Sequence, residues 1–137
     1  MRKLTFQHFL LYLFLVGCSF GSTNLRKSNS HSGISYDRKE VVRATQDLIG
    51  IPYRYGGKDK RGFDCAGLTQ YIFKSVEVSL PPSAEMQSRI VKEIKLEKVV
   101  PGDFLYFKRS KFGRVFQVAL VVSHDVDGIR VVHSTST

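Results

Sequence analysis

The apolar positions of the N-terminal half of the domain repeat with the period of a helix. Residues 37–50 place their apolar side chains on one helical face, with Asp37 as the N-cap and Gly50 as the stop. A second helix is predicted over residues 64–74, because Leu, Tyr and Ile recur there at helical spacing. Ser83 follows two prolines and can cap a short third helix. The first half is therefore expected to be helical.

The C-terminal half changes to runs rich in Val, Phe, Ile and Tyr, which are typical of strands. Three strands are predicted within residues 99–107, 114–123 and 128–134. The pair Asp127-Gly128 is a strong hairpin signal between the last two runs. Helices followed by an antiparallel sheet indicate an α+β domain.

The first residues have the layout of a bacterial lipoprotein signal. Residues 1–17 begin with two cations, continue through an apolar run too short for a comfortable membrane span, and end before Cys18. Cleavage there would leave Cys18 to carry the lipid, residues 18–36 would form a flexible tether, and residues 37–137 would be the domain. An uncleaved anchor, or an ordinary signal with an incidental cysteine, are the alternatives.

The chain is strongly basic, with a formal net charge of +9 at pH 7. A basic surface attracts polyanions. Export argues against nucleic acid as the partner and favours anionic envelope polymers or phospholipid headgroups. A surface that is basic only for solubility explains the composition equally well.

Cys65 directly follows Asp64 at the predicted start of the second helix. The unpaired N–H groups and the dipole at a helix N-terminus favour a thiolate, and they can also bind an oxyanion. Acylation of Cys18 would leave Cys65 without a disulfide partner. A nucleophile and a buried, inert thiol both remain open on these residues alone.

Several segments together resemble one protein family. The stretch IPYRYGGKDKRGFDCAGLTQYIF is followed by SLPPSAEMQ, VVPGDFLYF, QVALVV and VVHSTST. In order and spacing these are similar to the NlpC family of bacterial cell-wall cysteine peptidases. The resemblance covers the chain from about residue 40 to its C-terminus.

The resemblance implies a small papain-like fold in which a helix that carries the nucleophile packs on an antiparallel sheet. It assigns Cys65 as the nucleophile and His133 as the orienting residue. Tyr55 and Asp64 fall on positions that hold the peptidoglycan stem peptide. Ala66 stands in the substrate-binding region at a place where the family usually has a serine.

Two departures from the family pattern bear on activity. Gln117 occupies the place of the family's general-base histidine, and an amide cannot take up a proton at physiological pH. The chain also ends directly after the strand of His133, which suggests a truncated domain.

Another histidine could serve as the base. His124 would lie far from Gln117 on a regular strand, whereas His133 is already at the site in the family arrangement. A two-residue turn at Asp127-Gly128 would pair His133 with Val122 and not with Gln117. The sheet would have to curl, bulge or use a longer loop to bring them together.

The sequence therefore predicts a lipid-anchored cysteine endopeptidase of the cell envelope. In a cell with two membranes, it is expected at the outer membrane, facing the periplasm. Its substrates would be peptidoglycan stem peptides, cleaved between D-glutamate and a diamino acid, with no metal or organic cofactor. A catalytically degenerate cell-wall-binding adaptor is the alternative that Gln117 favours. An acyltransferase that uses the same thiol is also chemically open.

Overall fold

The computed structural model describes residues 36–136. The predicted signal segment, Cys18 and the tether as far as residue 35 lie outside the described residues. Tyr36 is the first described residue, and its ring packs edge-on against Phe73 with 5.0 Å between ring centroids. Across residues 36–136, none of the helices combines the length and the apolar character that crossing a membrane requires.

The helices form where the capping residues predict them. The Asp37 side chain accepts hydrogen bonds from the backbone N–H groups that open the first helix, and Ser83 does the same for the third. The first predicted helix divides into an α-helix and a 3₁₀ turn before Gly50. The helical elements are α1 (Arg38–Ala44), η1 (Gln46–Leu48), α2 (Cys65–Lys74), α3 (Ala84–Arg89) and η2 (Leu96–Lys98).

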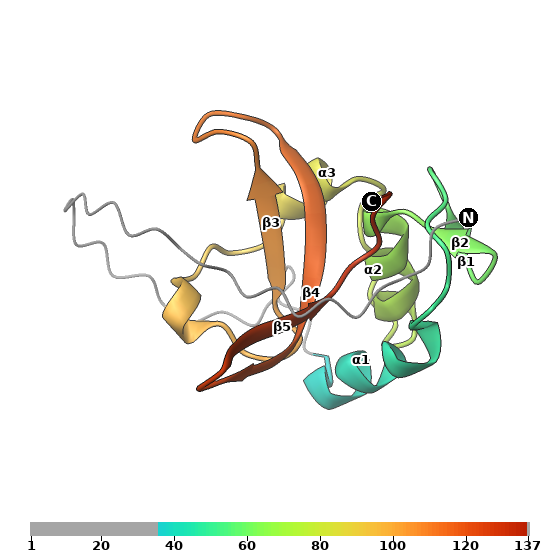
Figure 1. Cartoon of the computed structure of the whole chain (residues 1–137), viewed down its shortest axis with the longest axis horizontal. Helices are drawn as coiled ribbons and strands as arrows, with labels where there is room; N and C mark the ends of the chain where they lie inside the picture. The colour runs from blue at the N-terminus through green and yellow to red at the C-terminus, as the bar shows by residue number, and fades with distance from the viewer. Residues whose placement is uncertain (1–35, 137) are drawn as a thin grey trace.

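The strands form two antiparallel sheets. A two-stranded sheet precedes α2, and a three-stranded sheet with the order β3-β4-β5 follows the helices, with β4 in its centre (Figure 1). The mixed architecture confirms the predicted α+β class. The strands are β1 (Lys58–Asp59), β2 (Gly62–Phe63), β3 (Phe104–Lys108), β4 (Val115–Asp125) and β5 (Gly128–Val132).

The register between β4 and β5 departs from the predicted hairpin. Asp125 pairs with Gly128, so the two turn residues are Val126 and Asp127, one position earlier than predicted. A register shift between Val121 and Ser123 adds a bulge, which leaves Val122 as the extra residue. Together these changes move the end of β5 along β4 toward Gln117, as the site requires.

A second bulge lies at the start of β4. Phe107 pairs with Gln117 and Lys108 pairs with Val115, so Phe116 is the extra residue and has no partner on β3. Its ring is 51% exposed. The bulge thus turns an aromatic side chain outward where β4 begins.

The main core lies between α2 and the sheet. The face of α2 that contains Leu68 and Ile72 packs against β4 and the end of β5 (Figure 1). Burial of this apolar stripe fixes the helix against the central strand. The buried members of this core are Val41, Leu48, Phe63, Leu68, Ile72, Phe73, Val78, Leu80, Leu120 and Val132.

Candidate active site

The first turn of α2 presents a cysteine. Asp64 is the N-cap, and one oxygen of its carboxylate accepts a 2.6 Å hydrogen bond from the backbone N–H of Gly67. Cys65 is the first residue of the helix and is partly exposed. The cap satisfies the N–H of Gly67, and the N–H groups of Cys65 and Ala66 in the same turn are left without an intrahelical partner.

Three backbone N–H groups interact with the Cys65 sulfur and favour its thiolate form. Two belong to Cys65 and Ala66 in the first turn of α2, and the third belongs to Val118 on β4. Burial outweighs them, and the nearby Asp64 carboxylate adds to its effect, so the pKa of the Cys65 thiol is raised above its usual value. The position of Cys65 at a helix N-terminus alone predicts a larger fraction of thiolate than burial and Asp64 together allow.

Gln117 lies on β4 directly before Val118, and its amide binds the segment that follows β5. Its Nε2 group donates a 3.1 Å hydrogen bond to the carbonyl oxygen of Ser134 and lies 3.2 Å from Nδ1 of His133. A carbonyl oxygen only accepts hydrogen bonds, so this partner fixes which end of the amide faces His133. Nδ1 of His133 is then an acceptor, and the neutral imidazole has its proton on Nε2.

His133 is half-buried, and burial lowers the pKa of its imidazole below the usual value. The ring is therefore neutral near pH 7. The next residue anchors the segment, because the buried hydroxyl of Ser134 donates a 2.6 Å hydrogen bond to the carbonyl oxygen of Phe63 on β2. This bond ties the end of the chain that contains His133 to the strand that leads into Cys65.

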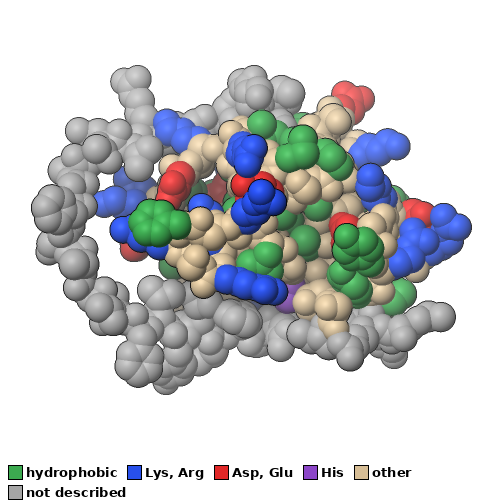
Figure 2. Space-filling view, turned by 90° about the horizontal axis from the view of Figure 1, so that it is seen from above, with side chains coloured by type: hydrophobic (Ala, Val, Ile, Leu, Met, Phe, Trp, Pro, Cys, Tyr) green, Lys and Arg blue, Asp and Glu red, His purple; other side chains and the backbone are tan. Residues whose placement is uncertain are grey.

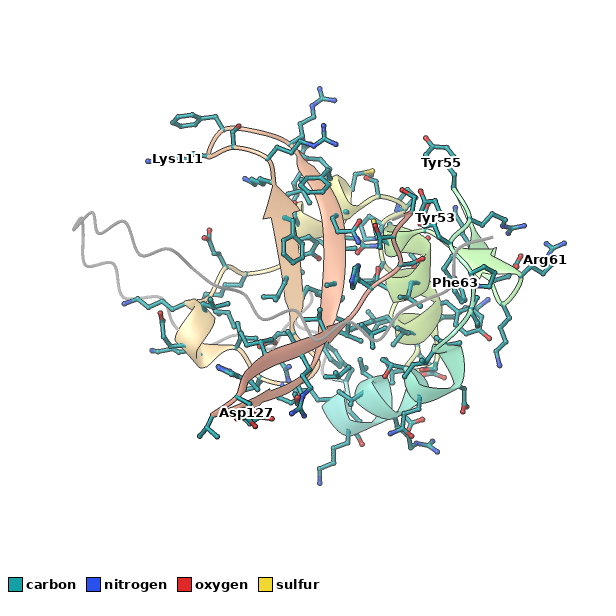
Figure 3. The ribbon with its side chains drawn as sticks, viewed as in Figure 1. Tyr53, Tyr55, Arg61, Phe63, Lys111 and Asp127 are labelled. Carbon is teal, nitrogen blue, oxygen red and sulfur yellow. The ribbon has the colours of Figure 1, made fainter. Side chains whose placement is uncertain are left out.

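The two tyrosines of the segment before β1 lie differently. Tyr55 is 91% exposed and points away from the domain (Figure 3). Tyr53 lies nearer the helix, and its pKa is raised by burial and also by the negative charges of Asp64 and Cys65. Tyr53 is therefore the tyrosine that shares an electrostatic environment with the nucleophile.

The remaining predicted positions do not all contribute a side chain to the site. Ala66 is 4% exposed, and its carbonyl oxygen accepts hydrogen bonds from Thr69 and Gln87. Its side chain is thus part of the helix packing, and its N–H group is the part that contacts the sulfur. His124 lies near the other end of β4, where its Nδ1 is 2.7 Å from the carbonyl oxygen of Val99.

Close backbone contact holds the segment before β1 against α2. The N–H of Asp64 donates a 3.1 Å hydrogen bond to the carbonyl oxygen of Gly57. A Cβ on Gly67 would overlap that same oxygen, and a Cβ on Gly57 would overlap the carbonyl oxygen of Gly62. Glycine is required at both positions because backbone lies where a side chain would start.

This fold and this arrangement agree with one protein family. The NlpC/P60 family profile matches residues 50–135, which include Cys65, Gln117 and His133. The chain belongs to the NlpC/P60 family. The resemblance found in the sequence motifs is thereby confirmed.

Curated relatives of this NlpC/P60 domain include named hydrolases. It is 37% identical over 102 residues to the Gamma-DL-glutamyl hydrolase of Bacillus subtilis (strain 168), an alignment that covers 71% of this chain and 23% of the relative. It is 33% identical over 100 residues to the Probable endopeptidase NlpC of Escherichia coli (strain K12), with 70% and 62% covered. The chain thus spans 23% and 62% of the lengths of these two relatives.

Solved structures share the fold of this NlpC/P60 domain. A NlpC/P60 family protein from Bacillus cereus ATCC 10987 aligns with a TM-score of 0.60 and 24% identity over 76% of this chain and 37% of that one. The NlpC/p60 domain of the peptidoglycan hydrolase SagA aligns with a TM-score of 0.56 and 25% identity over 71% and 89%. These likenesses support the predicted papain-like NlpC-type fold.

Sequence reasoning missed three contributors to the site of this NlpC/P60 domain. The N–H of Val118 could not be identified, since any residue supplies a backbone N–H and only the packing of β4 on α2 selects this one. Ser134 has a weak signal, a hydroxyl directly after His133. Tyr53 stands two residues before Tyr55 and in the same short motif, so composition does not distinguish them.

Proposed function

We propose that this chain is a cysteine endopeptidase that hydrolyses γ-D-glutamyl bonds in peptidoglycan stem peptides. The observation that supports this best is the group of three N–H donors around the sulfur of Cys65, at a helix N-terminus and beside β4. Such donors stabilise a thiolate and the oxyanion that forms when it attacks a carbonyl. The name of one curated relative, Gamma-DL-glutamyl hydrolase, favours γ-glutamyl bonds, and the structural likeness to the peptidoglycan hydrolase SagA favours peptidoglycan as the source of the peptides.

The reaction begins when the Cys65 thiolate attacks the amide carbon. A C–S bond forms, and an electron pair of the carbonyl moves to its oxygen, near the N–H groups of the first turn of α2. The tetrahedral species collapses with cleavage of the C–N bond, and the leaving amine takes up a proton. Water then hydrolyses the thioester and regenerates the thiol.

Asp64 and Tyr53 are proposed to hold the substrate. One carboxylate oxygen of Asp64 accepts the capping hydrogen bond from Gly67. A carboxylate has a second oxygen, which can accept a hydrogen bond from an amine of the stem peptide. Tyr53 adds a phenolic hydroxyl near the same charges. Tyr55, which the motif match assigned to this role, is too exposed to enclose a ligand.

Proton transfer is the weak part of this mechanism. His133 is the histidine beside β4 at the site, but the amide of Gln117 occupies its Nδ1 lone pair and leaves a proton on Nε2. The imidazole can accept the thiol proton only when that hydrogen bond opens. We therefore expect slow hydrolysis, because general-base catalysis commonly supplies ~10²–10⁴ in rate.

One observation favours a second candidate function. The hydrogen bonds from Gln117 to His133 and Ser134 close the site as a stable polar network without a free base. A domain that binds cell-wall peptides without cleaving them, as a tethered adaptor, would have this arrangement. The two functions differ in whether an acyl-Cys65 intermediate forms.

We also propose that Cys18 carries a lipid that anchors the protein in the cell envelope. The proposal rests on the apolar run of residues 1–17 and on the small residues before Cys18. In a cell with two membranes, the Ser19 that follows favours the outer membrane and a domain that faces the periplasm.

The decisive experiment incubates purified muropeptides with three soluble forms that lack residues 1–18. These are the natural sequence, Cys65→Ala and Gln117→His, and the products are identified by mass spectrometry. We expect slow cleavage by the natural sequence, none by Cys65→Ala, and about 100-fold faster cleavage by Gln117→His, because an imidazole replaces an amide at the position next to Val118.

The other outcomes separate the two functions. Cleavage by Gln117→His alone would show a peptidase scaffold whose natural form is inactive, and binding would become its function. Equal cleavage by Cys65→Ala and the natural sequence would refute the thiol mechanism.

A further inference from the structure

The loop between β3 and β4 is basic and aromatic. Residues 108–116, here called the basic arm, contain four cations and no acidic residue. All four cationic side chains are exposed, and so is the ring of Phe112, at 94%. The cations are Lys108, Arg109, Lys111 and Arg114. A single exposed aromatic residue is ordinary, but one surrounded by unopposed cations is typical of a binding surface.

The arm holds its cations against its own aromatic rings. The Arg109 guanidinium lies 5.3 Å from the centre of the Phe116 ring, and the Lys111 ammonium lies 5.7 Å from that of Phe112. Within residues 36–136, the salt bridges that form involve other cations than these four. Their charge is therefore available to a partner.

The C-terminal end of the basic arm, at Val115, packs close to the nucleophile. Val115, between Arg114 and Phe116, is buried in one cluster with Val118 and Ala84, and Cys65 packs against that cluster. The N–H of Val118 also interacts with the Cys65 sulfur. Since a strand rises about 3.3 Å per residue, Phe116 and Val118 are roughly 7 Å apart. A substrate chain bound at Cys65 could therefore extend to the basic arm.

One acidic side chain, that of Glu85, faces the basic arm, and its carboxylate is already bound to other groups. The Glu85 carboxylate accepts a 2.7 Å hydrogen bond from the N–H of Val115 and forms a 3.0 Å salt bridge with Arg89. Its pKa is lowered by these two partners first, and Lys108 adds to the effect. Glu85 thus fixes the Val115 end of the basic arm to α3 and leaves the cations in the rest of the arm unopposed.

The arm and the site residues lie along one edge of the domain. In Figure 3, Lys111 lies at one end of the upper side of the domain and Tyr55 at the other, with Tyr53 just below Tyr55. The face seen from above this edge displays Lys and Arg side chains among hydrophobic ones, with fewer acidic side chains (Figure 2).

We propose that the basic arm is a second substrate-binding site for carboxylate-bearing γ-glutamyl polymers. This inference rests on the proposed function and extends it. In a γ-linked glutamyl chain each α-carboxylate stays free, so every such residue carries a negative charge. The arm cations bind those carboxylates and the exposed ring of Phe112 covers apolar parts of the chain, beside the bond that Cys65 attacks.

The test measures binding by the full-length chain with Cys65→Ala, purified in a non-ionic detergent. Isothermal titration calorimetry uses two probes, poly-γ-glutamate and muramidase-solubilised peptidoglycan fragments, each also with amidated carboxylates. The arm variant carries Arg109→Gln, Lys111→Gln and Arg114→Gln. A matched control, with Lys92→Gln, Lys95→Gln and Lys98→Gln, loses the same charge from exposed positions elsewhere.

We expect the arm variant to bind at least one carboxylate polymer about tenfold more weakly, since three exposed ion pairs are lost. The control should change less than twofold, and amidated polymers should not distinguish the variants. The polymer that shows the loss identifies the source of the carboxylates. Equal losses in both variants, or a loss in neither, would overturn the proposal.

The same experiment separates this inference from the proposed function. Binding is read in the Cys65→Ala background, so it does not depend on hydrolysis. Arm-dependent binding without cleavage by the natural sequence would refute the peptidase and leave the arm as a binding site. Cleavage without arm-dependent binding would support the peptidase and refute the arm.

Discussion

At the scale of single residues, the site is decided by two opposing effects on Cys65. The N–H groups from α2 and β4 stabilise the thiolate, and burial together with Asp64 destabilises it. In the usual cysteine–histidine pair an imidazolium tips this balance toward the thiolate. Here Gln117 is neutral, and the buried His133 resists protonation. The thiol form therefore dominates at neutral pH.

This balance predicts the pH dependence of hydrolysis. Because the pKa of Cys65 lies above its usual value of 9.0, the thiolate fraction grows about tenfold per pH unit below that pKa. We expect kcat/KM of the natural sequence to rise steeply from pH 7 to pH 9, with no step from the neutral His133. In Gln117→His the rise should begin at lower pH. A plateau already at pH 6.5 in the natural sequence would show a thiolate–imidazolium pair instead.

At the scale of elements, α2 and α3 are joined by one buried amide. Gln87 on α3 is 0% exposed, and its Nε2 group donates hydrogen bonds to the carbonyl oxygens of Ala66 and Pro81. Its Oε1 lies 3.0 Å from the Thr69 hydroxyl, which shares its one proton between this oxygen and the carbonyl oxygen of Ala66. The amide satisfies backbone groups in the first turn of α2, so it helps to set the position of that turn.

Replacing this amide should destabilise the domain. Gln87→Leu keeps the approximate volume but removes the hydrogen bonds to the carbonyl oxygens of Ala66 and Pro81, at a cost of about 2–4 kcal/mol. Equilibrium urea unfolding measures the change. The exposed Gln46→Leu is the matched control and should stay within about 0.5 kcal/mol of the natural sequence. Equal stability of the two variants would contradict this account of Gln87.

At this scale, the sequence predicted best those elements that depend on interactions between residues close together in the chain. The caps Asp37, Asp64 and Ser83 and the β-branched runs predicted the elements, because hydrogen bonding to a neighbour or side-chain branching determines them. The register of β5 could not be predicted. It depends on the bulge at Val122, which tertiary packing selects and no residue type announces.

At the scale of the whole molecule, the domain brings together segments that are far apart in the sequence. Cys65 is far from Gln117 and His133 in the sequence. In the fold, β4 and the end of β5 nevertheless pack against α2. The family motifs predict Cys65 and His133 as partners in the site, and that pairing stays a prediction. They assign Tyr55 to the substrate, and the 91% exposure of its side chain is the reason for proposing Tyr53 in that role.

The proposed lipid at Cys18 belongs to this scale as well. We expect the full-length chain, expressed in bacteria with labelled palmitate, to incorporate the label and to fractionate with membranes. Cys18→Ser should do neither, because the thiol is the acceptor. Cys65→Ala is the control, and it should be labelled like the natural sequence. Labelling that persists in Cys18→Ser would refute the anchor.

The contact between Gly57 and Gly67 has a consequence for how such domains diversify. A side chain on Gly67 would overlap the carbonyl oxygen of Gly57, and a side chain on Gly57 would overlap that of Gly62, which leads into the same helix. The segment that precedes β1 and the helix that begins at Cys65 must therefore be inherited as one block. Specificity transplanted from a relative by exchanging that segment alone would fail, whereas exchange of residues 53–67 together would preserve the nucleophile.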